Sequence, residues 1–269
     1  MATVAVLNQK GGVGKTTVVL GLAAAAQRRG EATLVVDLDP QGSAGWAMGV
    51  EADDDHLAIG DVLRTGDPRV AAAATVRSGW GAGVDVLPAS RNLIERESDA
   101  ATADDPDRLR QALADLVGTY ETVLVDCAPS LGPTTRSGLV AADGVLLVAE
   151  LSALSLRGAD AVVDTIEEVG ADDHPGLGLF GTVVNRAPSV STEAERQLAA
   201  LEHHLGRGTV WRPFIPQRAV LNEAVGRRCP IQDLGRKAGP VVAIFDVLYD
   251  RLRDTADELT RGRVPTDEP

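Results

Sequence analysis

The sequence predicts an α/β protein, a single domain in which a doubly wound, mostly parallel sheet is flanked by helices. Three observations predict this class. Short runs rich in Val and Leu alternate along the chain with longer segments of helical periodicity, as in repeated βαβ units. Most of these runs are nearly continuous stretches of apolar residues, as in strands buried on both faces. The length of 269 residues fits one α/β domain, which we place at residues 1–260, with 261–269 as a short flexible tail.

Seven strands are expected, because seven runs are short, apolar and bounded by polar or glycine-containing turns. In order, these strands cover residues 4–7, 33–36, 84–87, 122–125, 144–148, 178–184 and 209–211. The helices expected between them cover about 15–29, 104–118, 134–142, 156–169 and 191–205, with one or two more from Val220 onward. The last helix, at about 240–259, carries apolar residues at near-helical spacing, so one of its faces should pack on the core.

The composition excludes several classes of protein. With 26 Lys and Arg against 39 Asp and Glu, the net charge is -13, so the average surface repels nucleic acid and anionic membranes. Three Trp, two Tyr and three Phe are too few for a platform that stacks single-stranded bases. Two cysteines cannot form a disulfide framework, which fits a reducing cytosol. We expect no signal peptide and no membrane span, and a cytoplasmic protein.

A phosphate-binding loop is predicted directly after the first strand, in the segment NQKGGVGKTT at residues 8–17. Its glycines let successive backbone N–H groups turn toward phosphate, and the following helix adds its N-terminal dipole. Lys15 supplies a positive charge and Thr16 a hydroxyl group for Mg²⁺. The usual pattern has glycine where Gln9 stands, and Lys10 is an additional lysine. Only one other lysine, Lys237, occurs in the chain.

This loop resembles the deviant Walker-A motif of the ParA/MinD superfamily of ATPases. Further segments resemble that superfamily's other motifs in the same order, and they follow its ParA branch. They are VVDLDPQGS at 35–43, VLVDCAPSLG at 123–132, AADGVLLV at 141–148, VVNR at 183–186 and FIP at 214–216. The resemblance covers about residues 3–250.

The resemblance implies a role for each matching residue, with ATP and Mg²⁺ as cofactors. Asp39 would orient the attacking water, and Lys10 would reach the nucleotide of a second subunit, so that two ATP molecules join a sandwich dimer. Mg²⁺ would be held by Thr16, Asp37 and Asp126, the aspartates acting through its waters. The phosphates would be bound by Gly11, Gly12, Val13, Gly14, Lys15, Thr16 and Thr17. The adenine would contact Asn185, Pro216 and Arg218.

Plainer interpretations of three of these residues stay open. Asp39 precedes Pro40 and has the sequence context of a turn residue. For Asp126 the alternative is a helix-capping or purely structural role. Asn185 follows a strand, where asparagine is commonly a turn residue. Cys127 is interpreted as a buried packing residue, not as a nucleophile.

Two departures from the pattern also matter. Relatives often have two prolines after the Walker-B cysteine, where this chain has Ala128 first. Those that bind DNA often have a basic residue where Val220 stands.

Positive charge is concentrated in residues 205–240, which carry seven basic and two acidic residues. This basic segment is the candidate surface for duplex DNA, with Arg227 and Arg228 as the expected phosphate contacts. DNA binding should not depend on base sequence. In the alternative, the arginines of this segment are satisfied by nearby carboxylates.

The resemblance implies a ParA-type partition ATPase associated with the nucleoid. ATP would drive dimerisation and nonspecific DNA binding, and a ParB-like or other cargo-adaptor protein would stimulate hydrolysis and release. One alternative is a MinD-like membrane-associated positioning ATPase, which needs a basic amphipathic C-terminal helix. The final residues RGRVPTDEP oppose it through Pro265 and the terminal acids. Another alternative is a metabolic ATP-dependent ligase, or a reductase component, on the same fold.

Overall fold

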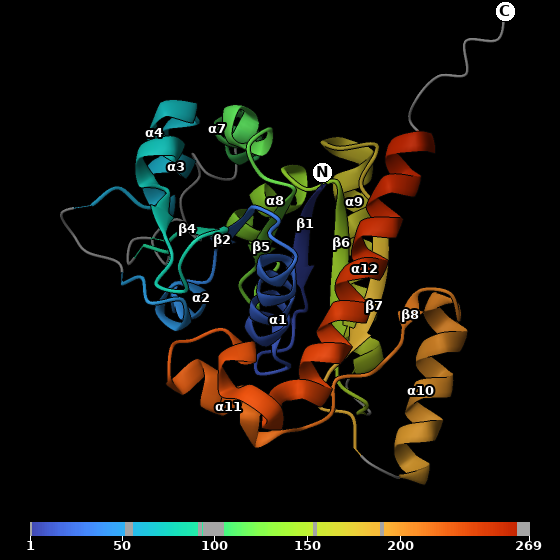
Figure 1. Ribbon diagram of the computed structural model, residues 1–269. Helices are drawn as coiled ribbons and strands as arrows, with labels where there is room; N and C mark the ends of the chain where they lie inside the picture. Colours follow the sequence, from blue (N-terminus) through green and yellow to red (C-terminus); the bar gives the residue numbers. More distant parts are fainter. Residues whose placement is uncertain are drawn as a thin grey trace, which may run out of the picture.

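An eight-stranded sheet with the order β3-β4-β2-β5-β1-β6-β7-β8 forms the centre of the protein (Figure 1). The computed structural model describes residues 2–51, 56–90, 93, 105–152, 155–188 and 191–262. The strands are β1 (Ala2–Leu7), β2 (Thr33–Asp37), β3 (Val76–Arg77), β4 (Val84–Leu87), β5 (Thr122–Asp126), β6 (Gly144–Ala149), β7 (Leu179–Val184) and β8 (Val210–Trp211). All neighbouring strands pair in parallel except β3 and β4. The predicted fold class, a single α/β domain, is confirmed.

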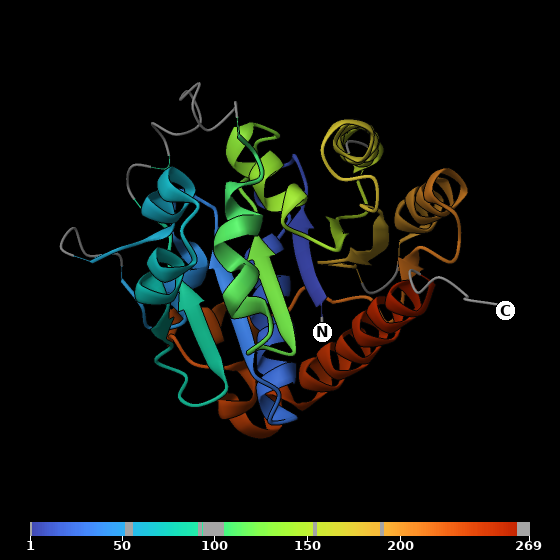
Figure 2. The ribbon, with the colours of Figure 1, turned by 90° about the horizontal axis from the view of Figure 1, so that it is seen from above.

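Helices cover both faces of the sheet (Figure 2). One face carries α1 (Lys15–Arg28), α2 (Ser43–Ala47), α11 (Ala219–Gly226), the 3₁₀ segment η1 (Ile231–Ala238) and α12 (Gly239–Gly262). The other face carries α3 (Ile59–Thr65), α4 (Pro68–Ala74), α7 (Arg108–Val117), α8 (Pro133–Val140), α9 (Ser155–Asp172) and α10 (Thr192–Leu205).

Residues of the central strands alternate between two hydrophobic cores. Val4 and Val6 of β1 pack into the core beneath α1 and α12, whereas Ala5 and Leu7 pack into the core beneath α7 and α8. Successive strand side chains point to opposite faces, and both faces are apolar here. This double burial explains why the strand runs contain so few polar residues.

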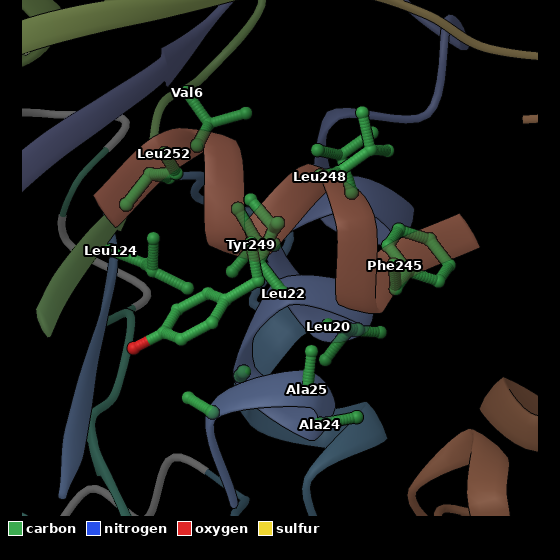
Figure 3. Close-up of a cluster of buried hydrophobic side chains, with 14 of the residues drawn as sticks. Val6, Leu20, Leu22, Ala24, Ala25, Leu124, Phe245, Leu248, Tyr249 and Leu252 are labelled. Carbon is green, nitrogen blue, oxygen red and sulfur yellow. The ribbon is translucent and has the colours of Figure 1, made fainter. Parts of the chain in front are cut away.

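The long helix α12 packs closely against α1 (Figure 3). A Cβ atom on Gly21 would lie 2.1 Å from the Phe245 ring, so only glycine permits this approach. The Tyr249 ring lies in the same cluster. Its hydroxyl group hydrogen-bonds to Thr122 Oγ1 at 2.8 Å and to Glu31 Oε2 at 2.6 Å. These contacts tie α12 to α1 and β5, and so hold the helix that starts at the phosphate loop.

The expected elements are present, with some differences. The short antiparallel strand β3 and the helices α2, α3 and α4 were not expected. The first strand starts earlier than expected, at Ala2, and β7 and β8 each start one residue later. The chain after Val220 forms α11, η1 and α12, with Gly235 (φ 68°) interrupting η1. Because α12 continues to Gly262, the predicted tail at 261–269 starts with two helical residues. Residues 263–269 lie outside the described part.

Candidate functional site

A cavity of about 680 Å³ lies at the carboxyl ends of β1, β2 and β5, where parallel α/β sheets bind ligands. The segments after these three strands supply most of its wall. It is lined by Gly11, Gly12, Gly14, Lys15, Thr16, Asp39, Pro40, Gln41, Ser43, Ala128, Pro129, Ser130 and Arg186. The structure therefore brings the predicted phosphate loop and the two predicted acidic motifs to one cavity.

Two glycines give the phosphate loop its shape. Gly12 and Gly14 have φ angles of 81° and 93°, in the left-handed region that favours glycine. At Gly14 a Cβ atom would also lie 2.2 Å from Asn185 Nδ2. The same Asn185 amide donates to the Val13 carbonyl oxygen at 2.7 Å, and the Val13 side chain is buried in the core. The loop is thus held open toward the cavity.

The Lys15 side chain is buried at the start of α1 and points back along the loop. Its Nζ atom donates to the Asn8 carbonyl oxygen at 3.2 Å, which leaves two ammonium donors for a ligand. Burial lowers the pKa of Lys15, and the carboxylate of Asp126 opposes that shift. An anion in the cavity would favour the charged form of this lysine.

Two buried carboxylates stand side by side at the ends of β2 and β5, because Asp37 and Asp126 are paired in the sheet register. Asp37 accepts from the Gly45 N–H at 2.9 Å, and burial raises its pKa to about 7. Asp126 Oδ2 accepts from Thr16 Oγ1 at 2.7 Å, whereas Oδ1 has no hydrogen-bond partner within the described residues. Burial, and next the charge of Asp37, raise the pKa of Asp126.

This oxygen-rich arrangement fits Mg²⁺, which prefers carboxylate, hydroxyl and phosphate oxygens. Thr16 supplies the hydroxyl group and Asp126 an unsatisfied oxygen atom. Within the described residues, no group of three His, Cys, Asp or Glu could hold a metal ion without further ligands. A Mg²⁺ ion that takes further oxygens from phosphate and water needs no such group.

Asp39 lies in a turn and also lines the cavity. Its Oδ1 atom accepts from the Gln41 N–H at 2.9 Å and its carbonyl oxygen from the Gly42 N–H at 2.8 Å, so it forms a turn around Pro40. It also lines the cavity together with Gln41. The turn holds the carboxylate group at the cavity wall.

Lys10 is held within its own subunit by two contacts. Its backbone N–H donates to Asn8 Oδ1 at 2.7 Å, and its Nζ atom pairs with Glu150 Oε2 at 3.2 Å. The other oxygen of Glu150 pairs with Arg186 Nη1 at 2.9 Å. Sequence reasoning missed Glu150 and Arg186 as site residues. Arg186 belongs to the VVNR segment, so a signal was present, whereas Glu150 had none.

Two of the three residues predicted to contact adenine meet at a smaller adjoining pocket of about 80 Å³. Asn185 and Arg218 line it, together with Thr17, Arg186, Gln217, Leu221 and Asn222. Asn185 Oδ1 is buried without a hydrogen-bond partner in the described structure. Pro216 does not line this pocket, but it forms an isolated bridge with Ala187 beside it.

The predicted DNA contacts Arg227 and Arg228 both form intramolecular ion pairs. Arg227 pairs with Glu223 at 2.8 Å one helical turn away, and its side chain is 64% exposed. Arg228 pairs with Glu51 at 2.8 Å, donates through Nε to the Trp46 carbonyl oxygen at 2.8 Å, and stacks over the Trp46 ring. Arg228 therefore joins the end of α11 to α2.

Two further expectations have structural outcomes. Cys127 is buried, and burial raises the pKa of its thiol to about 12, as befits a packing residue. Within the described part of the chain, no helix combines the length and apolar character needed to cross a membrane.

A P-loop nucleotide-binding fold is defined by this sheet, loop and cavity, and comparisons identify the family. Residues 1–177 match a family described as "AAA domain". The chain is 37% identical over 221 residues to the "Chromosome-partitioning ATPase Soj" of Thermus thermophilus, covering 82% of this chain and 83% of that protein. It is 33% identical to the "Chromosome partitioning protein ParA" of Caulobacter vibrioides, covering 83% and 84%. The chain belongs to the ParA branch of the ParA/MinD superfamily.

Solved structures share this fold. A cobyrinic acid a,c-diamide synthase from Mycobacterium smegmatis, with bound ATP analog and magnesium, is 33% identical, with a TM-score of 0.73 over 84% of this chain and 91% of that one. The ATP complex of a McdA variant from Cyanothece is 18% identical, with a TM-score of 0.84 over 94% and 96%, and shows the shared fold. The predicted cofactors, ATP and Mg²⁺, agree with these ligands.

Proposed function

We propose that this protein is a ParA-type partition ATPase that hydrolyses ATP with Mg²⁺. The observation that carries the proposal is the phosphate loop, which combines Lys15 on the cavity wall with a second lysine, Lys10, only five residues earlier. An ordinary phosphate loop needs Lys15 alone. The chain's similarity to Soj and ParA proteins over more than four fifths of its length supports the same function.

In the proposed cycle, each subunit binds one Mg²⁺–ATP in the cavity. Thr16, Asp37 and Asp126 would hold Mg²⁺, the latter two through its waters, and Asn185, Arg218 and the chain near Pro216 would contact adenine. Lys10 of each subunit would bind the phosphates of the other subunit's ATP, so that a dimer forms only with ATP. Asp39 would orient the attacking water. What these residues contribute is position, charge and the exclusion of misplaced water.

The dimer would bind duplex DNA without sequence preference through the basic segment 205–240, and so associate with the nucleoid in the cytoplasm. A ParB-like or other cargo-adaptor protein would stimulate hydrolysis and return the protein to monomers. Release from DNA would follow because the dimer doubles the number of phosphate contacts per bound particle.

The decisive experiment replaces Lys10 by alanine. Lys10→Ala should bind ATP as a monomer with an affinity close to that of the wild type, because Lys15 and the loop N–H groups remain. It should fail to dimerise with Mg²⁺–ATP, as measured by light scattering. Lys15→Ala is the matched control, and it should lose ATP binding itself. Normal ATP-dependent dimerisation of Lys10→Ala would overturn the proposed mechanism.

A second candidate function is ATP-dependent amide synthesis, which the similarity to the cobyrinic acid a,c-diamide synthase favours. The two functions predict different stimulators of ATP turnover. Duplex DNA together with the cognate adaptor should accelerate turnover by a partition ATPase, whereas cobyrinic acid with an amide donor should accelerate turnover by a synthase. Measuring phosphate release under both conditions separates them.

A further inference from the structure

Glu150, the residue that follows β6, holds two cations beside the nucleotide cavity. Its Oε2 atom pairs with Lys10 Nζ at 3.2 Å, and its Oε1 atom pairs with Arg186 Nη1 at 2.9 Å. Arg186 lines the cavity. One carboxylate group therefore binds, within the same subunit, the lysine that the proposed cycle needs in the other subunit.

The backbone of Lys10 is anchored without Glu150. Its N–H donates to Asn8 Oδ1 at 2.7 Å, and the buried Asn8 amide donates to the Val148 carbonyl oxygen of β6 at 2.6 Å. The lysine side chain can consequently leave Glu150 while the phosphate loop keeps its place. Removing the carboxylate charge should likewise leave the loop geometry intact.

We propose that Glu150 is an intramolecular latch on Lys10, which competes with the ATP phosphates of a second subunit for the lysine ammonium group. The inference rests on the proposed function, because it assumes that Lys10 acts across the dimer. A single carboxylate carries one negative charge, and a triphosphate carries several, so bound ATP in the partner displaces the latch. The latch thus raises the protein concentration at which the ATP dimer forms.

Arg186 makes the latch reversible. When Lys10 leaves, the carboxylate of Glu150 keeps the Arg186 guanidinium group as a counter-charge, so it is not left as an uncompensated ion. Without Arg186, Glu150 would lose one of its counter-charges, and release of Lys10 would be less favourable.

The expected size of the effect follows from exposure. The Lys10 side chain is 35% exposed and that of Glu150 is 20% exposed, so solvent screens the pair. Partly exposed ion pairs of this kind change an equilibrium by about threefold. Because each dimer uses two Lys10 side chains, loss of the latch should tighten the dimer by about tenfold.

The test is sedimentation equilibrium of the full chain with Mg²⁺ and a saturating non-hydrolysable ATP analogue. Glu150→Gln keeps the shape of the side chain and removes its charge, and its dimer dissociation constant should fall about tenfold. Arg186→Ala should change the constant in the opposite direction, which serves as a second test should Glu150→Gln fail to fold. The double variant Lys10→Ala/Glu150→Gln should stay monomeric, since the gain requires Lys10.

The outcomes separate the latch from the proposed function. If Lys10→Ala stays monomeric while Glu150→Gln dimerises no more tightly than the wild type, the latch is refuted and the proposed function stands. Tight dimerisation of the double variant would also refute the latch, because the gain would not pass through Lys10. If Lys10→Ala alone dimerises like the wild type, the proposed function fails and the latch fails with it.

Discussion

Asp126 places a carboxylate oxygen in the protein interior without a hydrogen-bond partner among the described residues, beside the second buried carboxylate of Asp37. Burying two such groups together costs free energy of folding unless a cation or protons compensate the charge. The raised pKa values of both groups express the same cost. A bound cation is therefore expected to relieve the repulsion between these two carboxylates.

Asp126→Asn tests this expectation. The neutral amide should raise the melting temperature of the ligand-free protein in EDTA by about 3 °C, because it removes part of the charge repulsion. The substitution should also remove most of the additional rise in melting temperature that Mg²⁺ causes when ATP is bound to the protein. Differential scanning calorimetry of both proteins in EDTA alone, with ATP in EDTA, and with ATP in Mg²⁺ measures both effects. A Mg²⁺ effect of wild-type size in the variant would contradict the assignment.

A substitution at Asp39 tests ATP hydrolysis separately from ATP binding. Asp39→Ala should bind ATP and dimerise, because the phosphate loop is untouched, but hydrolyse ATP at least about 10²-fold more slowly, because the water loses its orienting carboxylate. Stopped-flow phosphate release measures the rate, and light scattering shows the trapped dimer. Wild-type turnover would reduce Asp39 to the turn residue that its bonds to Gln41 and Gly42 also make it.

Among the helices and strands, the local sequence was sufficient to predict an element where burial on both faces produces a continuous apolar run. The strands β1, β2, β5 and β6 are apolar because each packs against two helical layers. The helix α2 was missed because it has only five residues and begins after Gly42 in the left-handed region. Its position depends on a tertiary hydrogen bond from Gly45 to Asp37, which no local pattern reveals.

The same distinction applies to the site. Loop spacing predicted the cavity-lining residues of the phosphate loop, because Gly14, Lys15 and Thr16 are neighbours in the chain. It could not predict that Glu150 binds both Lys10 and Arg186, since these partners lie 140 and 36 residues away. Nor could it predict that Arg228 contacts Trp46, which is 182 residues away.

The junction of α12 with α1 and β5 makes a prediction about alkaline pH. Burial, and then the hydrogen bond to Glu31, raise the pKa of Tyr249 to about 12, above its usual value of about 10. A raised pKa in the folded state means that this stabilisation is complete below pH 10 and is lost as the pH rises through 12.

Tyr249→Phe removes the titrating group and two hydrogen bonds. At pH 7 the variant should melt about 3 °C below the wild type, because it loses these bonds. As the pH rises from 9 to 11, the difference should shrink, since the wild type loses stability that the variant never had. Circular dichroism melting curves at each pH measure the difference. A constant gap would show that folding does not raise the pKa of Tyr249.

Over the whole molecule, charge is unevenly distributed, but less so than the sequence count indicates. The basic segment 205–240 has an excess of five positive charges within a chain of net charge -13. The fold brings Glu51 and Glu202 beside it, where they pair with Arg228 and Arg212. Those pairs reduce the field that duplex DNA would meet, so affinity should depend on the arginines that remain accessible.

Arg227 and Arg228 therefore have different expected effects on DNA binding, although they are neighbours in the chain. Arg227 has one solvent-exposed ion pair to exchange for a phosphate, whereas Arg228 would have to leave both Glu51 and Trp46. Replacing both would flatten the log-affinity versus log-salt slope of the ATP dimer by roughly 3 to 4 if all four arginines touched phosphate. With Arg228 retained on α2, we expect about half of that.

Filter binding of unrelated duplexes across a salt series, beside melting curves, resolves the two contributions. Arg227→Ala should flatten the slope by about 2, equally for all duplexes, and leave the melting temperature nearly unchanged. Arg228→Ala should leave the slope close to that of the wild type and lower the melting temperature by a few degrees, because α11 loses its contacts to α2. If neither variant changes the slope, duplex DNA does not bind at this end of α11, and the ATPase assignment stands without it.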